Sequence, residues 1–341
     1  MDIQDQLGIA VAGPHGRCHD FLHCLGAVHG ADAVAAFCPP LDRVIEDREI
    51  KGRGIESTGP PLRYYSSHED LLRDGEVDAV VLATSPLDDP ADIHLHALDT
   101  VRRGKHLLMD GLLASEVAAG EVLAAAAEDM GVTLAVAYEQ RRMPAVRELK
   151  RRLKPERTGT PLFVTAHVSG MASPMPGAAG AAPAISVDPL SRLYHQGAGM
   201  VDLLTYLFGD IELVSVLADP RVNEVHPADA MVCSLLLEGG LPASLSLVQR
   251  SPLSWMLRIC STRSVCSLSD GYTLFVETDT GGEILPLGED EADPLVKTVE
   301  DFTLAIQEDE KPEVGASEGL QVVRFFASAS RFLQDTLARR N

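Results

Sequence analysis

Residues 104–114 read Gly-Lys-His-Leu-Leu-Met-Asp-Gly-Leu-Leu-Ala, and this stretch decides the fold. Its apolar run predicts a buried strand that ends at Asp110. Residues 77–83 form a second such run, and the segments 93–103 and 115–130 have helical periodicity. Strands that alternate with helices predict a doubly wound α/β domain, in which ligands bind outside the carboxyl ends of the parallel strands. Asp110 is therefore a candidate site residue.

The second part of the chain has a different pattern. Residues 163–168 alternate like a strand with one covered face, and about six strand-like runs follow between Ile211 and Val276. A turn signal at Gly239-Gly240 separates two of these runs, as is typical of antiparallel strands joined by hairpins. We predict two domains: residues 1–137 with a parallel sheet, and residues 138–341 with helices and a large, mostly antiparallel open sheet.

The composition excludes several classes of partner. The chain has 341 residues, a formal net charge of -21 and a mean hydropathy of +0.05. Nucleic acid and anionic membranes attract basic patches, so we expect neither as a partner. The first residues have neither a basic start nor a long apolar run. We therefore predict no signal peptide and no membrane anchor, and we expect a cytoplasmic protein.

The cysteines and histidines do not form a metal-binding pattern. Six cysteines show no Cys-x-x-Cys pair and no zinc-type spacing with histidine. His94 and His96 are two residues apart, so on a helix they point to different faces. We predict reduced thiols and no metal site.

The first strand and helix carry a degraded dinucleotide-binding pattern. A Gly-x-Gly-x-x-Gly turn lets the backbone approach a pyrophosphate and lets the helix pack closely on the strand. Only the first glycine is in place in this chain, whose turn consists of Gly13, Pro14, His15, Gly16, Arg17 and Cys18. We predict that residues 13–17 bind the phosphates at the helix N-terminus, with added charge from His15 or Arg17. A plain strand-to-helix turn is the alternative.

The second strand, residues 33–37, ends without the acidic residue that binds the ribose hydroxyls in NAD sites. Cys38 follows it, and Asp42 and Arg43 are the nearest charged residues. We predict Cys38 as a cofactor contact, while Asp42 and Arg43 are either ribose contacts or surface residues. The pattern leaves both NAD and NADP open.

Several segments together resemble the glucose-fructose oxidoreductase and inositol dehydrogenase (Gfo/Idh/MocA) family; they are residues 64–72, 77–84, 104–108, 138–144, 197–209 and 312–329. The resemblance implies an N-terminal Rossmann-type domain and a C-terminal α/β domain, whose open sheet pairs subunits into a homo-oligomer. It also implies hydride transfer between NAD or NADP and a sugar or polyol carbon. Because a Thr-Pro pair follows the strand at residues 77–83 in this family, the resemblance implies Thr84, Ser85 and Pro86 as cofactor contacts.

The positions that carry the family's chemistry differ in this chain. Asp110-Gly111-Leu112 stands where the family has Glu-Lys-Pro, and Gly199 stands at its catalytic His position. His195 replaces the family's acidic residue and lies one helical turn before Gly199, on the same face. We predict proton-handling roles for three residues, which are His195, Asp110 and Tyr194. Asp202 is either a fourth catalytic residue or a structural hydrogen-bonding group.

Three functions remain open from the sequence. The first is an NAD(P)-dependent oxidoreductase with a rebuilt site that acts on a sugar-like or other small hydroxyl or carbonyl substrate. The second is a catalytically inactive homologue that serves as a ligand-binding, regulatory or partner subunit. The third is non-redox chemistry in the same site, a lyase or isomerase reaction with His195 as acid or base.

Overall fold

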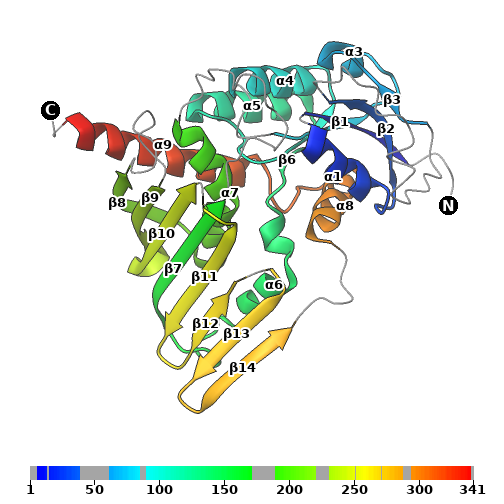
Figure 1. Ribbon diagram of the computed structural model, residues 1–341. Coiled ribbons are helices and arrows are strands. Elements are labelled where there is room, and N and C mark those ends of the chain that lie inside the picture. Colours follow the sequence, from blue (N-terminus) through cyan, green and yellow to red (C-terminus); the bar gives the residue numbers. More distant parts are fainter. Residues whose placement is uncertain are drawn as a thin grey trace. The chain divides into compact units, whose positions relative to one another are not determined.

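The computed structural model describes residues 6–13, 15–38, 61–84, 90–170, 189–219, 230–249, 251–269, 271–286 and 293–338. The chain divides into two compact units (Figure 1). Unit 1 comprises Met1–Tyr138 and Asp293–Leu320, and unit 2 comprises Glu139–Ala292 and Gln321–Asn341. Each unit is described by itself below.

The described strands of unit 1 form a six-stranded sheet in the order β3-β2-β1-β4-β5-β6. All pairs in this sheet are parallel. The strands are β1 (Leu7–Ala12), β2 (Ala31–Phe37), β3 (Arg63–Tyr64), β4 (Ala79–Leu82), β5 (His106–Met109) and β6 (Leu134–Val136). The side chains of β4 are all buried, as expected where helices cover both faces of a parallel sheet. The predicted Rossmann-type sheet is confirmed.

The helices of unit 1 pack in two layers. Figure 1 shows α1 (His15–Leu25) and α8 (Pro294–Gln307) on one side of the sheet, and α4 (Pro90–Arg102) and α5 (Val117–Met130) on the other. The short helix α3 (His68–Leu72) precedes β4.

Residues 293–320 return to unit 1, which differs from the predicted division at residue 137. The apolar face of α8 explains the return, because Leu295, Val299 and Phe302 are buried in the same core cluster as Phe21 of α1. Burying such side chains stabilises a fold by roughly 1.5–3 kcal/mol each.

The described strands of unit 2 form an eight-stranded sheet in the order β14-β13-β12-β11-β7-β10-β9-β8. Their bounds are β7 (Pro161–Gly170), β8 (Ile211–Asp219), β9 (Ala230–Leu237), β10 (Leu241–Gln249), β11 (Ser254–Ser261), β12 (Val265–Leu268), β13 (Thr273–Thr278) and β14 (Gly281–Pro286). Only the β7–β10 pair is parallel among these described strands. The predicted mostly antiparallel sheet is confirmed.

One face of this sheet is covered by helices. Helix α7 (Pro189–Phe208) packs on β7, β9 and β10, and α6 (Pro144–Arg152) packs on β12 and β13. The alternation of β7 follows from this cover, because Val164, Ala166 and Val168 are buried whereas Phe163 is exposed. The long helix α9 (Ala316–Ala338) begins in unit 1 and ends in unit 2.

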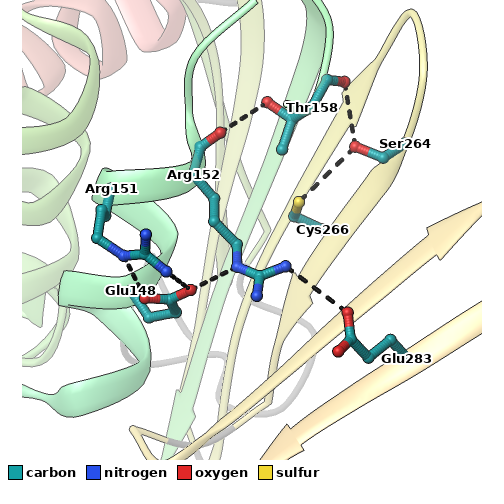
Figure 2. Close-up of polar contacts among 7 residues, drawn as sticks. All are labelled: Glu148, Arg151, Arg152, Thr158, Ser264, Cys266 and Glu283. Atoms are coloured by element: carbon teal, nitrogen blue, oxygen red, sulfur yellow. Dashed lines mark hydrogen bonds and ion pairs between the residues drawn. The ribbon is translucent and has the colours of Figure 1, made fainter. Parts of the chain in front are cut away.

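A polar cluster fastens the C-terminal end of α6 to the sheet (Figure 2). Glu148 accepts hydrogen bonds from both Arg151 and Arg152, and Arg152 also pairs with Glu283 of β14 at 3.7 Å. The Thr158 hydroxyl donates to the Arg152 carbonyl, and the Ser264 hydroxyl donates to the Thr158 carbonyl at 3.1 Å. The cluster thereby joins the C-terminal end of α6 to the sheet, and the short 3-10 turn η2 (Glu139–Arg142) directly precedes α6.

Candidate functional site

The strand order of unit 1 places a switch point between β1 and β4. The chain leaves β1 toward β2 on one side, and β4 lies on the other side of β1. Ligands bind at such a point, outside the carboxyl ends of the strands. The residues at these ends are Gly13 after β1, Thr84 close after β4 and Asp110 after β5.

Gly13 makes the turn from β1 toward α1. Its φ of +134° is a conformation that other residues rarely adopt, and a Cβ atom there would lie 2.0 Å from the Ala83 carbonyl oxygen. The first glycine of the pattern is therefore required by the fold.

Packing explains the residue at one other glycine position of the pattern, and the neighbouring Gly16 is open. Cys18 is fully buried, and its thiol donates to the Gly13 carbonyl at 3.2 Å, so a small side chain fits where the pattern has its third glycine. A Cβ atom on Gly16 would meet nothing within 4 Å. The turn thus keeps an open backbone surface at Gly16 although the pattern has changed.

An ion pair joins α1 to the end of β5. The Arg17 guanidinium donates from Nε and Nη2 to the two carboxylate oxygens of Asp110, each at 2.8 Å. The Arg17 guanidinium also lies 4.9 Å from the centre of the Phe21 ring. A bidentate pair of this kind fixes both side chains.

Thr84 completes this group of contacts. Its hydroxyl donates to the Asp110 carbonyl at 2.5 Å and so joins the ends of β4 and β5. We call Gly13, Arg17, Thr84 and Asp110 the carboxyl-edge site. Four of the predicted residues are thus brought together within unit 1.

The other predicted cofactor contacts fall elsewhere. Cys38 is buried in the hydrophobic core beside α1, so a ligand contact at this position would come from its backbone. Pro14, Ser85 and Pro86 lie outside the described residues, as do Asp42, Arg43 and the side chain of His15.

In unit 2, Asp202 of α7 forms a buried ion pair with Arg141 of η2. Arg141 Nε and Nη2 donate to the two Asp202 oxygens at 2.7 and 2.6 Å. The Arg141 guanidinium also lies 4.8 Å from the centre of the Tyr206 ring, over which Lys150 Nζ lies at 3.2 Å. Both Asp202 oxygens are engaged, so the geometry favours the structural alternative for this residue.

Tyr194 and His195 lie about two turns before Asp202 on α7. The Tyr194 ring stacks on Phe326 with 4.4 Å between ring centres, and its hydroxyl shares a hydrogen bond with Ser330 at 2.5 Å. Tyr194 is buried by these contacts, whereas His195 is partly exposed. Of the two, His195 is the one that solvent reaches.

The sequence reasoning missed Gln140. A Cβ atom on Gly199 would lie 2.4–2.6 Å from the three end atoms of the Gln140 amide, so this amide lies directly over Gly199. Gln140 Oε1 is buried and has no hydrogen-bond partner among the described residues. The available signal in the sequence was Gly199 itself. A glycine on an apolar helix has no side chain, and this leaves space for a neighbouring side chain.

The part of the chain that the structure describes has neither a cluster of potential metal ligands nor a helix able to span a membrane. It contains no group of three His, Cys, Asp or Glu side chains that could hold a metal ion. None of its helices is long and apolar enough to cross a bilayer.

The parallel strand order and the glycine turn at the switch point define a nucleotide-binding Rossmann domain as the class of unit 1. Residues 41–138 match the model of the Gfo/Idh/MocA family, described as an oxidoreductase family with an NAD-binding Rossmann fold. This match confirms the resemblance to that family. It begins after β2, so it does not include the Gly13 turn. A comparison with curated protein sequences gives no match.

Solved structures share the fold over nearly the whole chain. An aldose-aldose oxidoreductase from Caulobacter crescentus, complexed with glycerol, is 16% identical, with 97% of this chain and 98% of that chain covered and a TM-score of 0.76. A UDP-N-acetylglucosamine 3-dehydrogenase from Acidithiobacillus ferrooxidans is 19% identical, with 96% and 97% covered and a TM-score of 0.74. A 3-ketoreductase from Actinomadura kijaniata, in complex with TDP-benzene and NADP, is 18% identical, with 93% and 95% covered and a TM-score of 0.73. These structures show the shared fold, and the family match supports an NAD(P)-dependent oxidoreductase without naming its substrate.

Proposed function

We propose that this chain is an NAD(P)-dependent oxidoreductase of the Gfo/Idh/MocA type. It acts on a sugar-like or other small hydroxyl or carbonyl substrate through a rebuilt site. The observation that carries the proposal is the carboxyl-edge site, where the Gly13 turn and the Arg17–Asp110 pair meet at the switch point. The bound nicotinamide would supply the hydride acceptor or donor.

The residues of the turn fit a pyrophosphate. Gly13 turns the backbone where a Cβ atom cannot be placed, and Gly16 leaves open space above the first turn of α1. Helix N-termini favour anions, and Arg17, which is 28% exposed although it pairs with Asp110, offers a guanidinium group in the first turn of α1. We assign to Asp110 the role of orienting Arg17, because both carboxylate oxygens already accept from the guanidinium.

Proton transfer is assigned to His195. Tyr194 and Asp202 are engaged with Ser330 and Arg141, and we assign them to holding α7 in place. An imidazole has the pKa range best suited to proton transfer near neutral pH. General acid or base assistance typically accelerates a reaction by about 10² to 10⁴, so His195→Ala should lower turnover within that range.

A homo-oligomer is part of the proposal. The sheet face of unit 2 that carries Phe163, on β7, also carries Val232 on β9, and both side chains are exposed. On the same face, Ser244 lies between Thr165 and Ser234 in the strand register. A broad face of small and apolar side chains suits pairing with a second copy. All six cysteines are free thiols, which fits our expectation of a reducing cytoplasm.

A catalytically inactive homologue is the second candidate. It is favoured by Gly111 and Gly199, which offer no side chain where the family has Lys and His. Substrate-dependent turnover of the nicotinamide separates the two functions. Turnover without a net change in the nicotinamide would instead indicate lyase or isomerase chemistry.

The first experiment is a fluorescence titration of the purified protein with NADH and with NADPH. We expect saturable binding of at least one of them. Arg17→Gln should weaken it by about 10- to 100-fold, because a hydrogen bond to a charged group contributes about 1.5–3 kcal/mol. Gly13→Ala should abolish it, whereas the matched variant Gly75→Ala should not, since a Cβ atom on Gly75 meets nothing within 4 Å. Absence of binding at millimolar concentrations of both would overturn the proposal.

A further inference from the structure

We infer that the side-chain amide of Gln140, which fills the space that Gly199 leaves on α7, binds a hydroxyl group of the substrate. This inference rests on the proposed function and deepens it, because it names an uncharged, hydroxyl-bearing substrate class and the group in unit 2 that recognises it. Gln140 is a binding group here, since an amide does not exchange protons as an acid or base near neutral pH.

The first observation is steric. The Gln140 amide lies over Gly199, and any side chain at position 199 would start within 2.4–2.6 Å of its Oε1, Cδ and Nε2 atoms. Real Cβ atoms do not approach other atoms so closely. The glycine and the glutamine are therefore a matched pair: the absence of one side chain makes room for the other.

The second observation is an unpaired acceptor. Gln140 Oε1 is buried and accepts no hydrogen bond from the described residues. A buried polar atom without a partner costs about 1–3 kcal/mol, so it is kept only where something offsets the cost. A hydroxyl of a bound ligand would donate to Oε1 and remove this penalty.

The neighbouring charges favour an uncharged ligand. Arg141 follows Gln140 in the chain, but its Nε and Nη2 both donate to the buried Asp202 carboxylate. The positive charge beside Gln140 is thereby neutralised, which leaves the amide as the recognition group. An amide both donates and accepts hydrogen bonds, and this matches a hydroxyl or carbonyl group better than a carboxylate or phosphate.

The backbone of Gln140 is held in place by the residues that follow it in the chain. Arg141 is fixed to α7 through Asp202, and α6 is fixed to the sheet by the cluster of Glu148, Arg152 and Glu283 (Figure 2). Gln140 belongs to η2 and directly precedes these anchors. A binding group on a fixed backbone loses little conformational entropy when a ligand arrives.

The test measures the binding of three probes to the protein saturated with its reduced nicotinamide. The probes are the uncharged compounds glycerol, D-glucose and N-acetyl-D-glucosamine, and calorimetry gives their affinities. The variants are Gln140→Leu, which keeps the bulk and removes the amide, and Gly199→Ala, which displaces the amide. Gln321→Leu is the matched control, because Gln321 is exposed on α9.

We expect at least one probe to bind the wild type, and Gln140→Leu and Gly199→Ala each to weaken it about tenfold, which is the effect of roughly one lost hydrogen bond. Gln321→Leu should bind as the wild type does. Gln140→Glu should make the affinity fall as the pH rises through the carboxyl titration, a pH dependence that a purely structural role for Gln140 would not create.

Three results would overturn the inference. If a probe binds and Gln140→Leu leaves its affinity unchanged, Gln140 is not a binding group, although the proposed function stands. If the nicotinamide binds but no probe does, the hydroxyl-bearing substrate class is wrong. If neither reduced nicotinamide binds, the proposed function fails, and this inference fails with it.

Discussion

Among the described residues, each unit contains a bidentate arginine–aspartate pair, and these two pairs differ in their contact with solvent. In unit 2 the side chains of Arg141 and Asp202 are 7% and 1% exposed, whereas in unit 1 those of Arg17 and Asp110 are 28% and 6% exposed. The hydrogen-bond geometry is nearly the same. The comparison shows that geometry alone does not assign a role: the closed pair fixes a helix, and the partly open pair can interact with a ligand as well.

The largest loss of stability is expected when the buried pair, Arg141–Asp202, is broken. Asp202→Asn leaves the Arg141 charge buried without its counter-charge, so the free energy of unfolding should fall by about 3–5 kcal/mol. Urea denaturation measures this change. A loss below about 1 kcal/mol would show that Arg141 reaches solvent and that the two pairs are alike.

Breaking the partly exposed pair, Arg17–Asp110, should lower the free energy of unfolding by a smaller amount. For Asp110→Asn we expect a loss of about 1–3 kcal/mol, because solvent reaches Arg17 and partly compensates its charge. The same variant should weaken binding of the reduced nicotinamide, since Arg17 is no longer oriented. If stability falls as much as in Asp202→Asn while affinity is unchanged, the pair in unit 1 is structural only.

A buried histidine gives unit 1 a pH dependence that is separate from both pairs. Burial lowers the pKa of His68 from 6.5 to about 4, helped by the nearby His96, whose ring centre lies 4.4 Å away. The unfolded chain therefore binds a proton between pH 6.5 and about 4 that the folded chain does not.

The contribution of His68 to stability is complete above pH 6.5 and is lost as the pH falls toward about 4. The total loss should be about 3 kcal/mol, at 1.36 kcal/mol for each pH unit of pKa shift. Urea denaturation at several pH values measures it, and His68→Gln should remove most of the slope in this window. If the pH dependence of stability is unchanged in this variant, a group other than His68 takes up the proton.

The smallest change in stability is expected when an exposed ion pair is broken. Arg73 pairs with Glu69 one turn away on the surface, and their side chains are 59% and 61% exposed. Arg73→Gln should change the free energy of unfolding by no more than about 0.5 kcal/mol, and this small change should shrink in high salt. A loss as large as that of Asp110→Asn would contradict the ordering by burial.

The fold was predictable because its signals are local. Apolar runs at residues 77–83 and 104–114 alternate with helical segments. This local pattern predicts a parallel sheet without information about distant residues. Gly13 could likewise be found from its place after an apolar strand, since only a glycine fits the turn.

The contacts of the site were less predictable because they join residues far apart in sequence. Asp110 was a candidate by position, but its partner Arg17 lies 93 residues away, and no periodicity encodes that pairing. Gly199 was read as the loss of a functional side chain. The structure shows that another residue, Gln140, fills the space. Packing of this kind depends on three-dimensional proximity, which a single sequence does not contain.

The return of residues 293–320 to unit 1 has a consequence for synthesis of the protein. Strand β1 and helix α1 leave the ribosome early, yet α8, which covers the apolar face of α1, is made nearly 270 residues later. The nucleotide-binding unit therefore completes its core only after residues 139–292 of unit 2 have been translated. A shortened chain that stops at Tyr138 would leave Phe21 and Leu25 without the cover of Val299 and Phe302, and such a fragment should aggregate when expressed alone.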